Sequence, residues 1–214
     1  MRSPVGLFVV FEGGDGVGKT TQVELCCRWL DEQGFEVVRT FEPGDTAVGA
    51  AVRQIVLDPA TGDISPRAEA LLYGADKAQH LFAVVRPALA RGAVVVCDRY
   101  VDSMLAYQGA GRVLAADEVE QVARWATENL RPHLTVLLDT EPGRAVYAKA
   151  DQDRLEAAGE VFHEAVRRYF LELAQREPEC YLVLDARGTR ETIAAQVRER
   201  LAPLLSAVEA RIEA

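Results

Sequence analysis

The residues best suited to chemistry in this chain form one short stretch, GGDGVGKT, from Gly13 to Thr20. It matches the pattern G-x-x-x-x-G-K-[ST], in which glycines let the backbone coil so that successive N–H groups converge on a phosphate. In such a loop the lysine, here Lys19, reaches the β- and γ-phosphates of a nucleotide, and the Thr20 hydroxyl binds Mg²⁺. The residues expected to hold the nucleotide are Gly13, Gly14, Asp15, Gly16, Val17, Gly18, Lys19, Thr20 and Thr21.

The segments on either side of this loop are of the kinds that a phosphate-binding loop joins. Residues 7–11 (LFVVF) form a continuous apolar run, typical of a parallel strand that is buried on both faces. After the loop, Leu25, Trp29 and Leu30 recur at helical spacing among charged residues. The loop therefore leads into a helix N-terminus, whose unpaired N–H groups and positive dipole end attract anions. An ordinary glycine-rich turn is the alternative, and the order of strand, loop and helix disfavours it.

A second candidate group follows the apolar stretch at residues 93–97, where Asp98 and Arg99 come next. An apolar strand that ends on a carboxylate has the form of a Walker B strand, which holds Mg²⁺ directly or through water. A guanidinium at the carboxyl end of a strand is well placed to bind a phosphate through two hydrogen bonds. The alternatives are that Asp98 caps the following helix and that Arg99 is an ordinary surface arginine.

Two further groups of residues are candidates for nucleotide binding, but each of them taken alone is a weaker indication than the loop. Residues 149–156 hold Arg154 in a polar stretch before a helix, which is typical either of a mobile lid over a phosphoryl group or of an exposed loop. On an expected helix at residues 66–90, Tyr73 and Lys77 lie four residues apart and so share one face. That pair is suited to binding a base, and ordinary packing is the more common role of such a pair.

The composition of the chain narrows its class. With 214 residues it is long enough for a sizeable core, and we expect a single domain over residues 1–214. The formal net charge of −9 argues against a broad surface for nucleic acid. The four cysteines contain no C-x-x-C pair, which favours free thiols in a reducing cytoplasm. We also expect no signal peptide, no membrane span and no membrane partner.

The three histidines do not suggest another chemistry. His80, His133 and His163 show neither the spacing of metal ligands nor that of a catalytic triad. Metal-dependent hydrolysis and nucleophilic catalysis therefore lack candidate residues.

Apolar strand patterns alternate with helical patterns along the chain. The expected strands are residues 5–12, 36–41, 93–97, 134–138 and 181–184, and the expected helices are residues 18–33, 46–57, 66–90, 116–129, 156–176 and 189–211. Pro87 should bend or break the third helix, and residues 104–107 have the pattern of an ordinary amphipathic helix. This alternation predicts an α/β fold with a five-stranded, mostly parallel sheet that helices cover on both faces.

Ligands of such sheets bind beyond the carboxyl ends of the strands. The polar residues expected at those ends are Glu12, Glu42, Asp98, Asp139 and Asp185.

In order and spacing, five stretches of this chain resemble those of bacterial thymidylate kinase, a family of P-loop nucleoside monophosphate kinases. The stretches are FEGGDGVGKTTQ at 11–22, TFEPG at 40–44, DRY at 98–100, AYQG at 106–109 and DRLE at 153–156. The resemblance implies a three-layer P-loop kinase fold and the transfer of the γ-phosphoryl group of ATP to dTMP, giving dTDP. It also implies a homodimer, for whose interface the helices at 46–57 and 66–90 are candidates.

The same resemblance implies a role for each residue near the phosphates. Lys19 and the loop amides would bind the phosphates of ATP, and Thr20 would bind the magnesium. Arg154 would be the lid arginine, because Gly16 and Val17 occupy the loop positions where some members of the family carry the stabilising arginine. The residues implied for the acceptor nucleotide are Arg99 and Arg53 at its phosphate, Asp15 and Glu42 facing its sugar, Tyr73 stacked on thymine and Gln108 reading the base.

Three residues depart from the family pattern. Lys77 stands where the family usually has an arginine that contacts thymine, and Met104 stands where a small polar side chain usually meets the base. Phe41 replaces the arginine of the usual T-R-E-P-G stretch. Because Lys77 and Met104 offer fewer directed hydrogen bonds to the base, we predict a weaker or looser acceptor preference than is usual in the family.

Two other classes of function remain open at this point. One is a P-loop kinase that acts on another nucleoside monophosphate or on a deoxynucleoside. The other is a nucleotide-dependent switch or ATPase, against which stand the absence of an N-K-x-D motif and of a glycine shortly after Asp98.

Overall fold

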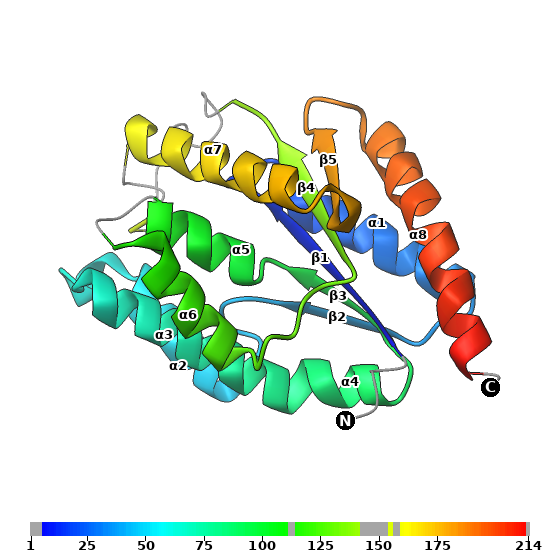
Figure 1. The fold of residues 1–214 in the computed structure, drawn as a ribbon, viewed down its shortest axis with the longest axis horizontal. Coiled ribbons are helices and arrows are strands. Elements are labelled where there is room, and N and C mark those ends of the chain that lie inside the picture. The colour runs from blue at the N-terminus through cyan, green and yellow to red at the C-terminus, as the bar shows by residue number, and fades with distance from the viewer. Residues whose placement is uncertain (1–5, 111–113, 142–153, 156–158, 213–214) are drawn as a thin grey trace.

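The structure is a computed structural model that describes residues 6–110, 114–141, 154–155 and 159–212. Its centre is a sheet of five parallel strands in the order β2-β3-β1-β4-β5 (Figure 1). The strands are β1 (Leu7–Gly13), β2 (Val37–Phe41), β3 (Val94–Asp98), β4 (Leu134–Asp139) and β5 (Tyr181–Asp185). The predicted α/β fold with a five-stranded parallel sheet is confirmed.

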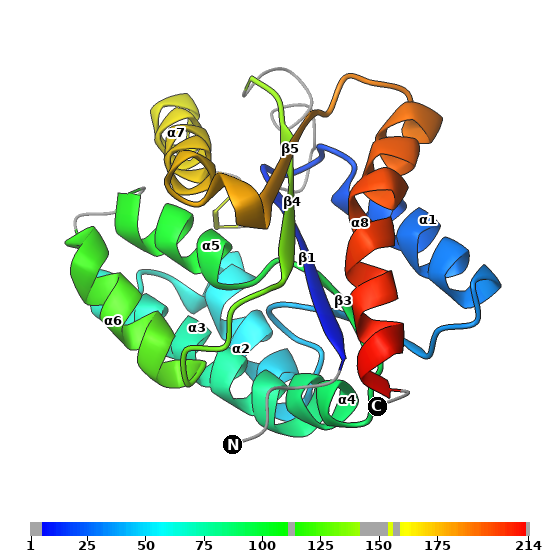
Figure 2. The ribbon, with the colours of Figure 1, turned by 45° about the vertical axis from the view of Figure 1, so that its right-hand side comes forward.

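The apolar run of β1 is buried because helices cover both faces of the sheet. Leu7, Val9 and Phe11 pack into a core with α1 (Lys19–Glu32) and α8 (Arg190–Ile212). Phe8 and Val10 point to the opposite face, as alternation along a strand requires, and pack against residues 81–89. Figure 2 shows α1 and α8 on one side of the sheet. Because both of its faces are buried, the central strand β1 has a continuously hydrophobic sequence.

The other face of the sheet is covered by the remaining helices (Figures 1 and 2). They are α2 (Ala47–Leu57), α3 (Pro66–His80), α4 (Arg86–Ala90), α5 (Val101–Met104), α6 (Ala116–Ala126) and α7 (Glu160–Arg176), with short 3₁₀ turns at Pro59–Thr61 and Pro178–Cys180. The helices α4, α5 and α7 contact the sheet, and α3 packs between α2 and α6.

The expected helix at 66–90 is interrupted where Pro87 predicts a break. The α-helix α3 ends at His80, and a π-helical segment, Leu81–Val85, leads into α4. Pro87 lies in the first turn of α4. Proline has no N–H to donate to the preceding turn and its ring crowds the carbonyl four residues earlier, and the wider π turn accommodates both effects.

The expectation of an ordinary helix at 104–107 is wrong in its geometry. The helix α5 has four residues and continues as a π-helical segment, Leu105–Ala110. A π turn holds more residues than an α turn, so the direction of each later side chain is shifted around the axis. The segment carries Tyr107 and Gln108, which both line the cavity described below.

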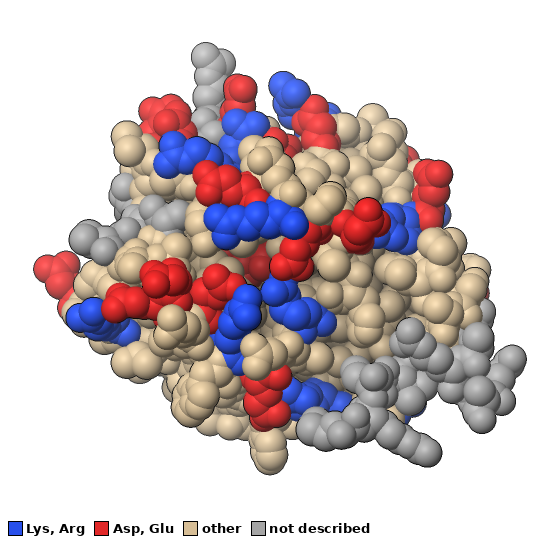
Figure 3. All heavy atoms as spheres, viewed as in Figure 1, with Lys and Arg blue, Asp and Glu red and all other residues tan. Residues whose placement is uncertain are grey.

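The outer surface carries charges of both signs. On the face that Figure 3 shows, acidic and basic side chains are interspersed. Among the helices in the described part of the chain, none is both long enough and apolar enough to cross a membrane.

Candidate active site

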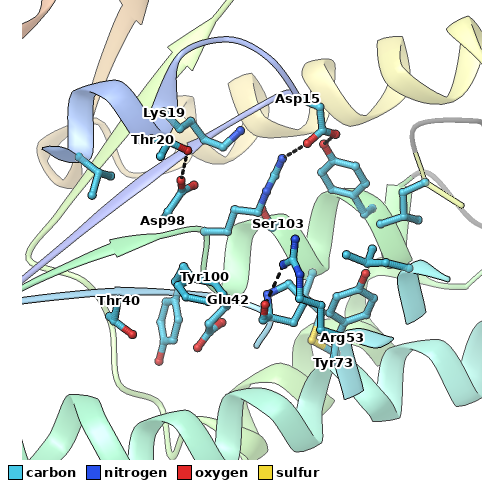
Figure 4. A pocket seen from close by; sticks show the side chains of 18 of the residues that line it. Asp15, Lys19, Thr20, Thr40, Glu42, Arg53, Tyr73, Asp98, Tyr100 and Ser103 are labelled. Carbon is cyan, nitrogen blue, oxygen red and sulfur yellow. Dashed lines mark hydrogen bonds and ion pairs between the residues drawn. The ribbon is translucent and has the colours of Figure 1, made fainter. Parts of the chain in front are cut away.

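One large cavity opens at the carboxyl ends of the strands, with a volume of about 780 Å³. A crevice at this edge is where open parallel sheets bind their ligands. Figure 4 shows Lys19 and Thr20 in its upper part and Glu42 and Tyr73 in its lower part. The predicted site residues that line it are Asp15, Gly16, Gly18, Lys19, Thr20, Thr21, Glu42, Arg53, Tyr73, Lys77, Asp98, Arg99, Met104 and Gln108. The predicted residues outside its lining are Gly13, Gly14, Val17 and Arg154.

The loop after β1 needs glycine at two positions that the structure makes clear. Gly13 has φ 133°, and a Cβ there would lie 2.4 Å from the carbonyl oxygen of Leu138. Gly18 has φ 96° and forms the N-cap of α1. Both conformations strongly favour glycine, and they turn the backbone from the strand into the helix. The pattern of glycines in the sequence is thus explained by backbone geometry.

The Lys19 side chain is buried and is held by the loop itself. Its Nζ donates hydrogen bonds to the carbonyl oxygens of Gly13, at 3.1 Å, and Gly14, at 2.5 Å. Burial and, after it, the charge of the nearby Arg99 lower the pKa of Lys19, while Asp15, Asp98 and Glu12 act to raise it, and the net result is a pKa of about 8. Keeping Lys19 protonated beside Arg99 in this buried site therefore lowers the stability of the folded chain.

The side chains of Thr20, in the first turn of α1, and Asp98, at the end of β3, come together. The Thr20 hydroxyl donates to Asp98 Oδ2 at 3.0 Å, as Figure 4 shows. Parallel pairing of β1 with β3 places Asp98 beside Phe11, two residues before the glycine loop begins. The alternative that Asp98 caps the next helix is wrong, because α5 begins after Tyr100 and has no capping bond from its N-cap side chain.

The guanidinium of Arg99 lies at the loop and not on the outer surface. Nη2 donates to Asp15 Oδ1 at 2.5 Å, and Nη1 donates to the carbonyl of Gly13 at 3.2 Å and to Ser103 Oγ at 3.0 Å. Its carbon Cζ lies 5.3 Å from the centre of the Tyr107 ring. Arg99 has φ 70°, an uncommon conformation for a residue with a side chain. The reading as an ordinary surface arginine is therefore wrong.

Asp15 links this arginine to the nucleotide loop. Its second oxygen, Oδ2, accepts a hydrogen bond from the Tyr107 hydroxyl at 3.0 Å. Burial acts to raise the pKa of Asp15, but the charges of Arg99 and Lys19 outweigh it and lower the pKa to about 2. Asp15 is thus a carboxylate at every physiological pH.

Glu12 supports the Arg99 loop from beneath. Its Oε1 accepts from the backbone N–H groups of Tyr100, at 2.8 Å, and Ser103, at 3.1 Å, and its Oε2 accepts from Ser103 Oγ at 2.6 Å. The sequence predicts Glu12 at a strand end but indicates no role for it, and it does not mark Ser103 as a site residue. Only the spacing of Ser103 four residues after Arg99 hinted at the contact.

The lower part of the cavity rests on a buried ion cluster. Lys77 Nζ donates to Glu42 Oε2 at 2.5 Å, and His80 Nδ1 lies 2.6 Å from Glu42 Oε1. Burial acts to raise the pKa of Glu42, but Lys77 and His80 together hold it below its ordinary value. Glu42 in turn raises the pKa of Lys77 against the effect of burial. Lys77 is therefore charged, with one of its N–H groups engaged by Glu42.

The other residues predicted at the acceptor line the same region. Arg53 Nη1 donates to the carbonyl of Pro43 at 2.8 Å, and its guanidinium carbon lies 6.0 Å from the Phe41 ring. The unusual Phe41 thus offers an aromatic face to Arg53. Tyr73 and Met104 are both buried in the core cluster that borders the cavity.

Arg154 lies away from the phosphate loop. Its Nη1 donates to the carbonyl of Val56 at 2.9 Å and to Glu69 Oε2 at 3.1 Å. Glu69 also accepts a hydrogen bond from Gln108 Nε2 at 3.2 Å. The rest of the predicted lid, residues 149–153 and 156, lies outside the described residues.

Comparison with known proteins decides the family. The family model described as "Thymidylate kinase" matches residues 11–197. This chain belongs to the thymidylate kinase family. The resemblance predicted from five short stretches of sequence is thereby confirmed.

Individual members of the family are similar over nearly the whole chain. A thymidylate kinase of Cutibacterium acnes is 56% identical over 201 residues, which are 94% of this chain and 98% of the relative. One from Clavibacter sepedonicus is 55% identical over 206 residues, 94% of this chain and 97% of the relative. A crystal structure of thymidylate kinase from Ehrlichia chaffeensis is 26% identical, with a TM-score of 0.74, and the match covers 92% of this chain and 98% of that one. The likeness therefore extends from the motifs to the fold.

Proposed function

We propose that this chain transfers the γ-phosphoryl group of ATP to dTMP, giving ADP and dTDP. Membership of the thymidylate kinase family supports both the class of enzyme and ATP as its co-substrate. The observation that carries the proposal is that one cavity is lined by the phosphate loop and by the residues expected at an acceptor. Arg99 lies between them, since it contacts Gly13 and Asp15 of the loop.

The reaction needs charge and alignment more than it needs a base. The second pKa of a phosphate monoester is about 6, so the acceptor is already largely a dianion at neutral pH. Two anions must be brought close together, and Lys19 and Arg99 supply opposing positive charge in a site that is mostly buried. We further propose that Arg154 leaves Glu69 and reaches the transferred group when the nucleotides are bound.

The residues at the loop fit a magnesium ion. Thr20 and Asp98 provide a hydroxyl and a carboxylate within hydrogen-bond distance of each other, and Mg²⁺ prefers such oxygen ligands. Among the described residues no cluster of three histidine, cysteine or acidic side chains is suited to a metal, so phosphate oxygens and water would complete the shell. When bound, the ion would offset the negative charge of the β- and γ-phosphates.

We also propose that two copies of the chain associate through α2 and α3. Leu71, Ala75 and Ala78 share one face of α3, and Phe82 follows four residues after Ala78. Leu71 is 60% exposed and Phe82, in the π-helical segment after α3, is 76% exposed. Val48 and Ile55 of α2 add further exposed apolar surface. Exposed apolar area of this kind marks an interface.

A cytoplasmic location is the last part of the proposal. All four cysteines are free thiols, which is the state that a reducing compartment maintains.

An ADP-release assay with a panel of nucleoside monophosphates tests the activity. The expected result is rapid ADP release that requires both Mg²⁺ and dTMP. Faster turnover with a different monophosphate or with a deoxynucleoside would favour another kinase of the same fold. Phosphate release that does not respond to any acceptor would favour a switch or an ATPase.

A further inference from the structure

Glu69 joins two residues that belong to different parts of the proposed mechanism. It lies on α3 with only 1% of its surface exposed. One of its oxygens, Oε1, accepts from Gln108 Nε2 at 3.2 Å, and the other, Oε2, accepts from Arg154 Nη1 at 3.1 Å. A buried carboxylate is costly unless its oxygens are paired, and both oxygens are paired here.

The pairing fixes the orientation of the Gln108 amide. A side-chain amide has a donating end, the NH₂ group, and an accepting end, the carbonyl oxygen. The Glu69 carboxylate, which pairs with Arg154 in this structure, has only acceptors and keeps only acceptors when Arg154 moves away, so it must face the NH₂ end of the amide. Among the described residues, none donates a hydrogen bond to Gln108 Oε1, and Gln108 lines the cavity. Its carbonyl oxygen is therefore the end left for a ligand.

A fixed carbonyl oxygen distinguishes between pyrimidine bases. Thymine and uracil carry an N–H at ring position 3, which donates to such an oxygen. Cytosine carries a bare nitrogen there, so two acceptors would face each other and the buried oxygen would remain unpaired. The other residues expected at the base do not replace this contact, because Met104 has no strong donor or acceptor and Lys77 can only donate.

We infer that Glu69 is a positioning residue for base selection, which holds Gln108 with its carbonyl toward the acceptor and so favours bases with a ring N–H over cytosine. The inference rests on the proposed function, since it takes the lower part of the cavity as the acceptor site. It is compatible with a loose preference among thymine, uracil and similar bases. It assigns the rejection of cytosine to a residue that does not itself line the cavity.

The test replaces Glu69 with glutamine. An amide at position 69 can donate as well as accept, so in Glu69→Gln the Gln108 amide can turn over and present its NH₂ group. The expected result is that the ratio of kcat/KM for dTMP to kcat/KM for dCMP falls by about 10-fold or more. Glu118→Gln is the matched control, because Glu118 is an exposed glutamate that pairs with Arg67 at 3.4 Å, and it should keep the ratio.

Arg154→Gln removes the Arg154–Glu69 ion pair but leaves the Glu69 carboxylate that orients the Gln108 amide. It should lower kcat for both acceptors by a similar factor and leave their ratio unchanged. The inference is overturned if Glu69→Gln keeps the dTMP to dCMP ratio, or if Arg154→Gln lowers that ratio as strongly. Thermal denaturation shows whether Glu69→Gln is folded. If it is not, Gln108→Met removes both the donor and the acceptor of the amide with little change in size, and this variant must lose the preference for dTMP over dCMP.

Calorimetric binding of dTMP and dCMP without ATP separates this inference from the proposed function. If the parent chain binds dTMP more tightly than dCMP and Glu69→Gln does not, the inference is supported even when no turnover is seen. In that case only the proposed phosphoryl transfer fails. Equal affinity of the parent chain for dTMP and dCMP overturns the inference, whatever its activity.

Discussion

Replacing Lys19 with methionine should make the protein more stable at neutral pH while it abolishes turnover. The ordinary pKa of lysine is 10.5, and burial with Arg99 nearby lowers that of Lys19 to about 8. A tenfold change in proton affinity corresponds to ~1.4 kcal/mol, so keeping this charge in the folded state costs about 3 kcal/mol. The side chain also makes two hydrogen bonds, to Gly13 and Gly14, whose loss offsets about 1 to 2 kcal/mol. A net gain of about 1 to 2 kcal/mol remains.

The pH dependence gives the sharper test of this reasoning. Below pH 8, Lys19 is protonated in both the folded and the unfolded chain, so its full cost is present. Between about 8 and 10.5 the folded chain releases the proton while the unfolded chain keeps it. The unfolded chain then binds more protons, and the stability of the parent chain rises with pH relative to Lys19→Met. The advantage of the variant should therefore shrink and reverse sign by pH 10.

Thermal denaturation of both proteins between pH 7 and pH 10 is the measurement. For a chain of this length about 1 to 2 kcal/mol corresponds to roughly 2 to 8 °C in Tm. Arg28→Met removes an exposed charge from the same helix and should change Tm little at any pH in this range. A Tm difference between the parent chain and Lys19→Met that stays constant from pH 7 to pH 10 would refute the argument.

Three further predictions concern acceptor binding, magnesium and assembly. Arg99→Ala should lower kcat/KM for dTMP about 100-fold or more, since it removes the donor expected at the acceptor phosphate, while the calorimetric Kd for ATP changes little. Asp98→Asn should raise the Mg²⁺ concentration needed for half-maximal activity, because it replaces the carboxylate proposed to bind Mg²⁺ with a neutral amide, and a Mg²⁺ titration measures this. Phe82→Glu should convert the proposed dimer into monomers, because it places a charge in the exposed apolar surface at the end of α3, and sedimentation measures the mass.

Each of these predictions has a result that would contradict it. The role of Arg99 is wrong if Arg99→Ala loses ATP affinity and keeps its affinity for dTMP. An unchanged Mg²⁺ requirement in Asp98→Asn would remove Asp98 from the metal site. For the dimer, Val161→Glu is the control, because Val161 is 82% exposed on α7, and an equal effect of the two substitutions would place the interface elsewhere.

The parts of this protein that the sequence predicts are those that local chain geometry dictates. The glycine loop is recognisable because Gly13 and Gly18 both adopt positive φ within one short turn. The break near Pro87 is likewise a local effect of a missing N–H. The parallel sheet follows from the alternation of apolar strands with amphipathic helices, a pattern that any buried parallel sheet shares.

The parts that the sequence does not predict depend on contacts between distant residues. Glu12 and Ser103 meet across 91 residues, and Glu69 and Gln108 across 39 residues. On their own segments Glu12 and Glu69 are ordinary polar residues. Ser103 is distinguished only by its spacing from Arg99, and Gln108 only by the family resemblance. The π-helical turn at Leu105–Ala110 also escapes prediction, because its sequence has the pattern of an α-helix.

The position of Arg99 has a thermodynamic consequence for the two substrates. Its guanidinium contacts the loop at Gly13 and the carboxylate of Asp15, and it is also the residue expected at the acceptor phosphate. Because one side chain belongs to both halves of the cavity, filling either half changes the energy with which the other is filled. This linkage is reciprocal, so the factor by which ATP alters the affinity for the acceptor must equal the factor by which the acceptor alters the affinity for ATP.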